Sequence, residues 1–275
     1  MDTGRIATND GVSLHYFEDG AGPPLVLIHG WSQSGALFRH QIESLRSFSR
    51  VIALELRGHG RSDRPGFGYN VARLSKDLDD ALNALGLNNC ALLGHSMGCA
   101  VIWSYIELFG TRRLSKLLFV DQPPAMMARP QWSAQEREDA GCVFDIAQVQ
   151  EICDGLRSPF HAMGYVDGML TSQLTEVDRR WLGEENRLFP RKYAAELFFE
   201  LCLGDWRKLI STIRLPTLVV GGRVSSTPWR SQEWIHKAIP GSDLRIFEKA
   251  EGGGHLMFLE NAGTFNHVVS SFLLR

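Results

Sequence analysis

The chain has 275 residues, of which 44% are hydrophobic and 22% are charged, and its formal net charge is −2. This length suits one α/β unit that buries its own core without disulfides or metals. Because the charge balance is nearly neutral, no basic face is expected for nucleic acid or for an anionic membrane surface. The five cysteines cannot all pair and show no CxxC spacing, which favours free thiols in a reducing compartment.

The ends of the chain show no targeting pattern. The polar opening Met1–Ile6 is not followed by an apolar stretch, so no signal peptide is expected, and no apolar run reaches the roughly 18 residues of a membrane span. These observations predict a cytoplasmic protein. The sequence contains no metal-ligand spacing and no nucleotide-binding glycine pattern, so neither a metal nor a cofactor is predicted. The oligomeric state is left open.

Apolar strands and amphipathic helices alternate through the first part of the chain. Two β-prone stretches flank Asn9-Asp10-Gly11, which is a strong hairpin signal, and the apolar run Pro24–Ile28 is typical of a strand buried on both faces. Further strands are predicted at 51–54, 90–93, 117–120, 215–220 and 244–247, with helices near 35–47, 71–86 and 97–109. This alternation predicts an α/β fold of three layers, a mostly parallel sheet with helices on both faces.

The alternation of strands and helices is interrupted between residues 123 and 212, where helix-like segments occur without a convincing strand. We interpret this segment as a helical lid inserted in a core made of residues 1–122 and 213–275. Its scattered apolar side chains include Met126, Met127, Trp132, Phe144, Met163 and Trp181. Met126, Met127 and Trp132 are candidates to contact a small hydrophobic substrate, since methionine adapts to varied shapes. The alternative is that these residues only pack the lid on the core.

The sharpest catalytic signal is Gly94-His95-Ser96-Met97-Gly98, a Gly-x-Ser-x-Gly pattern between an apolar strand and a helix. In that context Ser96 sits on a tight strand-to-helix turn, and the flanking glycines allow the neighbouring backbone to approach. The helix N-terminus also presents N–H groups to developing negative charge. Ser96 is therefore the predicted nucleophile; the alternative is a serine with a structural role in a turn.

A second signal is His29-Gly30-Trp31 at the end of a predicted strand. Addition to a carbonyl needs donors aimed at the oxyanion, each worth a few kcal/mol of barrier. The backbone N–H groups of Trp31 and Met97 are the candidate pair, and the Trp31 side chain is a candidate substrate contact. The alternative is a turn that ends a strand, with a histidine in the core.

The candidate general base is His255, which follows three glycines after the last predicted strand and precedes the closing helix. A serine hydroxyl needs a neighbouring base to become a good nucleophile. His95 adjoins the nucleophile, but on a tight turn its side chain is expected to point elsewhere. His236 and His267 fall on predicted helices and fit surface or packing roles better.

With these motifs, and with Arg57-Gly58-His59-Gly60-Arg61-Ser62, the chain resembles the α/β-hydrolase superfamily along nearly its whole length, the lid excepted. The core is most similar to the branch of small esterases, lactonases, C–C hydrolases and cofactor-free haloperoxidases. The resemblance implies a structural role for the Arg57–Ser62 segment. It also sets aside haloalkane dehalogenases and epoxide hydrolases, which use an aspartate where this chain has Ser96.

The acid of the triad departs from the usual pattern of the superfamily. Most members with these motifs carry it in Gly-x-x-Asp-x-x-x-Pro, but residues 221–228 here have Val224 at the acid position. Ser225 could replace the acid only weakly. Some members take the acid from the end of the preceding strand, which implies Asp121, where a carboxylate could fix the tautomer of the histidine. The alternative is an aspartate that bonds loop amides.

These residues together predict a serine hydrolase that cleaves an ester or lactone of a small hydrophobic molecule through an acyl-enzyme on Ser96. Hydrolysis of a C–C bond and formation of a peracid with peroxide in place of water are alternatives that use the same residues. A receptor of the same fold that hydrolyses its ligand slowly is a further alternative, because fold does not fix function.

Overall fold

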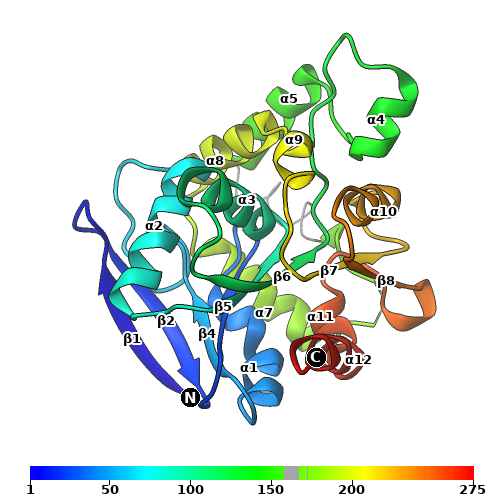
Figure 1. The fold of residues 1–275 in the computed structure, drawn as a ribbon. Coiled ribbons are helices and arrows are strands. Elements are labelled where there is room, and N and C mark those ends of the chain that lie inside the picture. The colour runs from blue at the N-terminus through cyan, green and yellow to red at the C-terminus, as the bar shows by residue number, and fades with distance from the viewer. Residues whose placement is uncertain (158–166, 172) are drawn as a thin grey trace.

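The computed structural model describes residues 1–157, 167–171 and 173–275, so Met163 lies outside the described residues. An eight-stranded sheet in the order β1-β2-β4-β3-β5-β6-β7-β8 runs through the molecule (Figure 1). Its strands are β1 (Asp2–Ala7), β2 (Ser13–Asp19), β3 (Pro24–Ile28), β4 (Arg50–Leu54), β5 (Cys90–His95), β6 (Leu114–Val120), β7 (Thr217–Gly222) and β8 (Asp243–Phe247). β1 and β2 pair antiparallel, as do β2 and β4, whereas the pairs from β4 across to β8 are parallel.

The helices cover both faces of the sheet. α1 (Arg39–Leu45), α11 (Met257–Glu260) and α12 (Ala262–Leu273) pack on one face, and α2 (Val71–Ala84), α3 (Met97–Phe109) and α10 (Trp229–Ala238) pack on the other. Two short 3-10 helices are η1 (Gly35–Phe38) and η2 (Lys249–Glu251). The predicted three-layer α/β fold is thus confirmed.

The central strands contribute side chains to two separate hydrophobic cores, one on each face of the sheet. In β3, Leu25 and Leu27 point into the core beneath α1 and α12, while Val26 and Ile28 point into the core beneath α2 and α3. All four side chains are at most 2% exposed. Because successive side chains of a strand point to opposite faces, a strand buried on both sides must be apolar throughout, as this run is.

The described part of residues 123–212 is helical, with α4 (Ala134–Ala140), α5 (Ile146–Leu156), α7 (Glu176–Arg187), α8 (Arg191–Leu203) and α9 (Arg207–Ile210). Its β-structure among the described residues is limited to two isolated bridges, Ala125 with Asp205 and Met127 with Phe144. The first bridge joins the start of this segment to its end, so the helical segment leaves and re-enters the core at neighbouring places.

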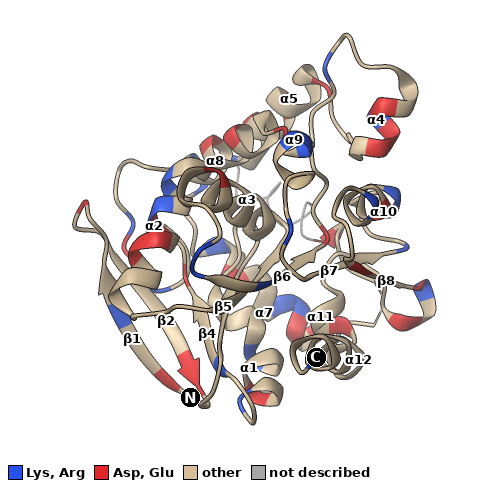
Figure 2. Cartoon of the chain, viewed as in Figure 1, with Lys and Arg blue, Asp and Glu red and all other residues tan. Residues whose placement is uncertain are grey.

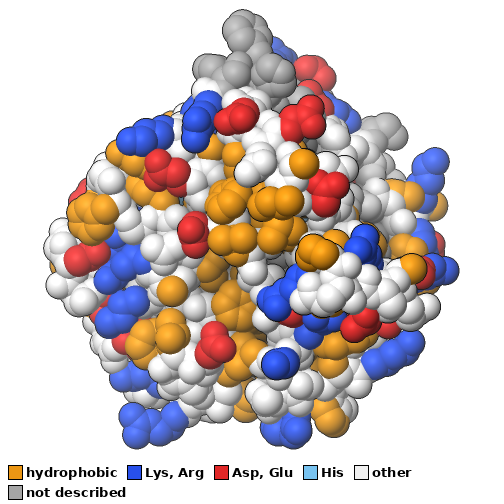
Figure 3. All heavy atoms as spheres, turned by 90° about the horizontal axis from the view of Figure 1, so that it is seen from above, with side chains coloured by type: hydrophobic (Ala, Val, Ile, Leu, Met, Phe, Trp, Pro, Cys, Tyr) orange, Lys and Arg blue, Asp and Glu red, His pale blue; other side chains and the backbone are white. Residues whose placement is uncertain are grey.

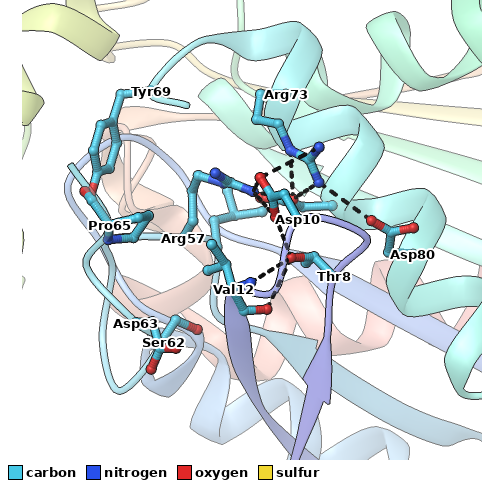
Figure 4. A network of polar contacts seen from close by, with 12 residues as sticks. Thr8, Asp10, Val12, Arg57, Ser62, Asp63, Pro65, Tyr69, Arg73 and Asp80 are labelled. Atoms are coloured by element: carbon cyan, nitrogen blue, oxygen red, sulfur yellow. Dashed lines mark hydrogen bonds and ion pairs between the residues drawn. The ribbon is translucent and has the colours of Figure 1, made fainter. Parts of the chain in front are cut away.

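The Arg57–Ser62 segment is fixed by a buried ion-pair network at the end of β4 (Figure 4). The Arg57 guanidinium is fully buried and donates to Asp77 of α2 at 2.6 and 2.7 Å and to Asp10 of the β1–β2 turn at 2.9 Å. Arg73 donates to Asp77 at 2.6 Å as well. One arginine therefore ties a hairpin turn, a strand end and a helix together, which fits a structural role for this motif.

The surface is mixed in charge. Lys and Arg residues and Asp and Glu residues are spread along the chain rather than gathered by sign (Figure 2). Viewed from above, apolar side chains gather near the middle of the face, with charged side chains of both signs around them (Figure 3). Among the described residues, no helix is both long and apolar enough to cross a membrane.

Candidate active site

Ser96 lies at the turn between β5 and α3 with a backbone φ of 53° and ψ of −125°, a conformation that is rare for a residue with a side chain. The flanking glycines make the turn possible. A Cβ on Gly94 would lie 2.5 Å from the carbonyl carbon of Gly98, and a Cβ on Gly98 would lie 2.2 Å from the Ile28 oxygen. The Ser96 amide donates to the Val120 oxygen at 2.8 Å, so β6 holds the turn in place.

The same close packing brings the end of β3 to the nucleophile. A Cβ on Gly30 would come within 3.0 Å of the Ser96 Cβ. The first turn of α3, which begins at Met97, therefore lies against the loop that follows β3 and includes Trp31. This is where the sequence predicts the two oxyanion donors: Met97 directly follows Ser96, and Trp31 directly follows Gly30, which lies against Ser96.

His255 contacts Asp121 directly. The His255 Nδ1 atom lies 2.6 Å from Asp121 Oδ2, and both side chains are at most 4% exposed. The other carboxylate oxygen, Oδ1, accepts from the Gly222 amide at 3.2 Å. Asp121 itself has a φ of 57°, which turns its side chain at the end of β6 toward the histidine loop. Since a carboxylate at Nδ1 leaves the proton on that nitrogen, Nε2 is available as a base.

Ser225 belongs to the same cluster. Its Oγ donates to Asp121 Oδ2, accepts from the Thr227 amide at 3.0 Å and lies 3.4 Å from His255 Nδ1. Val224, which occupies the usual acid position, is 45% exposed. The loop after β7 therefore reaches the histidine with a hydroxyl that bonds the carboxylate, whereas the candidate acid, Asp121, directly follows β6.

The histidine loop is held from two sides. The His255 amide donates to the Met169 oxygen at 3.1 Å, and the His255 oxygen accepts from His95 Nε2 at 2.9 Å. The His95 and His255 rings are 4.6 Å apart. Sequence reasoning expected the His95 side chain to point elsewhere. In the structure its Nδ1 atom lies 3.2 Å from Gln33 Oε1 and its Nε2 atom bonds the His255 backbone oxygen, so the side chain supports the loop of the candidate base.

Ser96 and His255 line a common cavity of about 310 Å³. The other lining residues are Gln122, Pro123, Met126, Val143, Phe144, Gly168, Met169, Ser226 and Thr227. Most of this wall is apolar, and none of its described residues is Lys, Arg, Asp or Glu. A cavity of this size lies at the lower end of the range of small-molecule sites, roughly 300–1,000 Å³.

The four predicted substrate contacts lie in different places. Met126 lines the cavity, whereas Trp31, Met127 and Trp132 are not among its lining residues. The Trp31 indole donates to the Ala194 oxygen at 2.8 Å, and Met127 packs against the main core. Trp132 is 9% exposed and lies under the Arg207 guanidinium, 3.7 Å from its ring centroid. The alternative, packing of the inserted segment on the core, describes the contacts of Met127, whereas Trp132 packs within the inserted segment itself, with Ala125 and Ala140.

Several cavity residues escaped sequence reasoning. Gln122, Ser226 and Thr227 follow the carboxyl ends of β6 and β7, where the side chains of parallel strands converge. Their place directly after two predicted strands could therefore have indicated these residues from the sequence. Val143 and Met169 come from the helical segment and have no motif around them.

Burial keeps the surrounding histidines neutral. It lowers the pKa of His29 to about 4 and the pKa values of His59 and His95 well below the ordinary value. The Nε2 atoms of His29 and His59 face the amides of Leu56 and Ser32 at 3.1 and 3.2 Å and accept from them. Among the described residues, no group of three or more His, Cys, Asp or Glu side chains is arranged to hold a metal ion.

Comparisons with known proteins identify the family of this chain. A family model for the alpha/beta hydrolase fold matches residues 23–141. The chain is also 36% identical over 276 residues to a protein of Synechocystis sp. that is named for a proposed non-heme chloroperoxidase activity, and the match covers 95% of both chains. The chain belongs to the α/β-hydrolase family.

Two solved structures are similar to this α/β-hydrolase over nearly their whole length. The bromoperoxidase of Bacillus anthracis superposes with a TM-score of 0.91 at 26% identity, covering 100% of both chains. An esterase of Exiguobacterium antarcticum superposes with a TM-score of 0.90 at 25% identity, covering 98% of this chain and 99% of the esterase.

Proposed function

We propose that this α/β-hydrolase is a serine hydrolase that cleaves an ester or lactone of a small hydrophobic molecule, with Ser96 as nucleophile, His255 as base and Asp121 as acid. The observation that supports it most strongly is the convergence of the three residues. Ser96 and His255 line one cavity, and Asp121 Oδ2 lies 2.6 Å from His255 Nδ1. Turns of this kind expose a serine to substrate, and a carboxylate so placed orients the imidazole.

In the acylation step, Ser96 Oγ bonds to the carbonyl carbon of the substrate while its proton moves to His255 Nε2. The carbonyl electron pair moves onto oxygen, where the backbone N–H groups of Trp31 and Met97 donate to the oxyanion. The tetrahedral intermediate then expels the alkoxide, which takes the proton from Nε2. Asp121 stays ionised and offsets the positive charge on the imidazole.

Deacylation repeats these steps with water. His255 Nε2 removes a proton from water as its oxygen attacks the acyl carbon, and collapse of the second intermediate returns Ser96 Oγ with that proton. A lactone follows the same route, but its alkoxide stays attached to the acyl group and leaves as the hydroxy acid.

The cavity favours an uncharged substrate. Its described lining residues include apolar Pro123, Met126 and Phe144 and carry no cation to pair with a substrate carboxylate. Burying an unpaired carboxylate is costly, so a substrate with an acidic group near the scissile bond is disfavoured. We further propose that residues 123–212 act as the lid of this site, since Met126, Val143 and Met169 of that segment form part of its wall.

The test combines turnover with covalent labelling. Hydrolysis of p-nitrophenyl acetate, butyrate and octanoate is measured for the wild type and for Ser96→Ala, with Ser44→Ala as a control because Ser44 is exposed on α1. A fluorophosphonate probe and peptide mass spectrometry identify the labelled serine. We expect turnover to fall at least a thousandfold in Ser96→Ala only, the shorter esters to be preferred, and the label to lie on Ser96.

Other outcomes are decisive. Labelling at Ser96 without ester turnover would move C–C cleavage, peracid formation or slow ligand sensing ahead of ester hydrolysis. Wild-type turnover that survives Ser96→Ala would remove Ser96 as the nucleophile.

A further inference from the structure

The loop of residues 30–34, which carries the proposed oxyanion donor Trp31, is attached to the inserted segment through three of its residues. We call it the oxyanion loop. The Trp31 indole Nε1 donates to the Ala194 oxygen of α8 at 2.8 Å. Ser32 contacts Asn186 and Arg191, and the Ser34 hydroxyl donates to the Glu185 carboxylate of α7. The end of α7 and the start of α8 therefore form direct hydrogen bonds with this loop.

Ser32 is the centre of these contacts. It is fully buried and has a φ of 55°, a conformation unfavourable for a residue with a Cβ. Its polar groups are all engaged. The amide donates to His59 Nε2 at 3.2 Å, the carbonyl accepts from Asn186 Nδ2 at 3.0 Å, and the hydroxyl donates to the Asn186 oxygen at 3.2 Å and accepts from Arg191 at 2.7 Å. Strained backbone persists where neighbours fix it in this way.

Arg191 is placed without a charged partner. Its guanidinium donates five hydrogen bonds to four neutral oxygens: Ser32 Oγ, the Asn186 backbone and side-chain oxygens, and the Phe189 backbone oxygen, which accepts two of them. Among the described residues no carboxylate lies within ion-pair distance of it. Burial lowers the pKa of Arg191 to about 10. A partly buried cation without a counter-ion is unfavourable for folding, so stability alone does not explain an arginine at this position.

We propose that Arg191 is a positioning residue for the oxyanion loop, holding Ser32 in its strained conformation so that the adjoining Trp31 amide points at the reacting carbonyl. The inference rests on the proposed function, because it assigns Arg191 a role in that reaction. Arg191 does not line the cavity that contains Ser96 and His255. It acts through Ser32 and touches no part of the substrate.

This placement makes a specific kinetic prediction. A donor that points at the oxyanion contributes in the transition state and little in the ground state, so its displacement lowers kcat and leaves KM nearly unchanged. A residue that only stabilised the fold would lower the melting temperature and the active fraction, without weakening the oxyanion contact of the active molecules. A residue that bound substrate would raise KM.

The experiment compares Arg191→Met and Arg191→Lys with the wild type, with Arg187→Met as a matched control because Arg187 is an exposed arginine at the end of α7. For each protein we measure kcat and KM for p-nitrophenyl butyrate, active sites by fluorophosphonate titration, and Tm. The inhibition constant of a trifluoromethyl ketone, which forms a tetrahedral oxyanion adduct on serine, reports the oxyanion contact itself. Ser32→Ala and the double variant Ser32→Ala/Arg191→Met complete a mutant cycle.

We expect Arg191→Met to lower kcat per active site about 10- to 100-fold with KM within about twofold, and to weaken the trifluoromethyl ketone by a similar factor. Arg191→Lys should be intermediate, since an ammonium can reach the Ser32 hydroxyl but lacks the planar fork. The double variant should be little worse than either single variant, because each substitution removes the hydrogen bond between Arg191 and the Ser32 hydroxyl. Arg187→Met should match the wild type.

An unchanged kcat per active site in both Arg191 variants, or a ketone affinity equal to that of the wild type, would overturn the inference. A raised KM with unchanged kcat would also overturn it. If Arg191→Met does not fold, Arg191→Lys and Ser32→Ala carry the same comparison. A wild type that shows neither turnover nor labelling at Ser96 defeats the proposed function, and this inference with it; wild-type turnover with inert Arg191 variants defeats the inference alone.

Discussion

At the scale of single residues, the unusual feature is the origin of the candidate acid. Asp121 directly follows β6, accepts from Gly222 and Ser225, and contacts His255, whereas Val224 at the customary position is exposed. Because the Nδ1 atom of His255 is already occupied, a second carboxylate has no function to fill. The loop after β7 contributes a hydroxyl in place of the acid.

This arrangement predicts the outcome of two substitutions. Asp121→Asn should lower kcat for p-nitrophenyl butyrate on the order of a thousandfold, because an amide cannot stabilise the imidazolium or fix its tautomer. Val224→Asp should leave kcat within about threefold of the wild type, since Nδ1 already has its partner. Initial rates normalised to fluorophosphonate-reactive sites check both. Near wild-type activity in Asp121→Asn, or a large gain in Val224→Asp, would contradict the assignment of the acid.

Ser225 illustrates where residue-level reasoning from sequence stops. Ser96 and His255 sit in motifs whose glycines specify a turn or a loop, so their identity as candidates can be read from neighbours in the chain. Asp121 could be proposed only because another position lacked its acid. The contact between Ser225 and Asp121 joins residues 104 positions apart and depends on how the loop after β7 folds back. No local pattern encodes that path.

At the scale of elements, Arg57 links the β1–β2 turn, the end of β4 and α2 through Asp10 and Asp77 (Figure 4). Asp77→Ala should destabilise the protein by about 3–5 kcal/mol, because it leaves a fully buried guanidinium without its main counter-ion. Asp79→Ala is the control, since its partner Lys76 is partly exposed and such pairs contribute about 0–1 kcal/mol. Urea unfolding measures the free energy of unfolding of both variants. If both lose the same amount, the buried pair contributes no more to stability than the exposed one.

The elements of the inserted segment have two different structural roles. Its start supplies Met126, Val143 and Phe144 to the cavity wall, and the end of α7 and the start of α8 hold the oxyanion loop. Helical periodicity predicted that this segment would be helical, and the β/α alternation on either side predicted the sheet. Which helix faces the cavity depends on packing between distant elements, and for that reason Trp132 and Met127 could not be told apart from Met126 in advance.

At the scale of the whole molecule, buried histidines govern the response to acid. Burial lowers the pKa of His29 to about 4, and the pKa of His59 lies well below its ordinary value. A lowered folded pKa means that stability is present above the unfolded value of about 6.5 and is lost as pH falls. Glu55 works in the opposite direction, since burial raises its pKa to about 7 and its contribution to stability grows as pH falls from 7 toward 4.5. Among the described residues, Glu55 is the carboxyl with a raised pKa, whereas the pKa values of His15, His29, His59 and His95 are all lowered, so the net effect between pH 6.5 and 5 is a loss.

We therefore expect the free energy of unfolding to fall between pH 6.5 and 5, by up to about 1.4 kcal/mol per pH unit for each histidine involved. His59→Gln should flatten this slope, because a glutamine can still accept from the Ser32 amide but cannot take up a proton. Urea unfolding at pH 7.5 and at pH 5.5 for both proteins provides the measurement. An identical pH dependence in the variant would show that His59 is not among the groups responsible.

The left-handed backbone of Ser96 has a consequence for how such a protein evolves. Among the described residues, four that are not glycine have positive φ, and three of them, Ser32, Ser96 and Asp121, belong to the candidate site or to the loop beside it. Each such residue costs of order 1–3 kcal/mol. Glycine at position 96 would relieve this cost, and under the proposed function it would remove the nucleophile in the same step. The proposed function therefore predicts that a serine is retained here against the gain in stability that glycine offers.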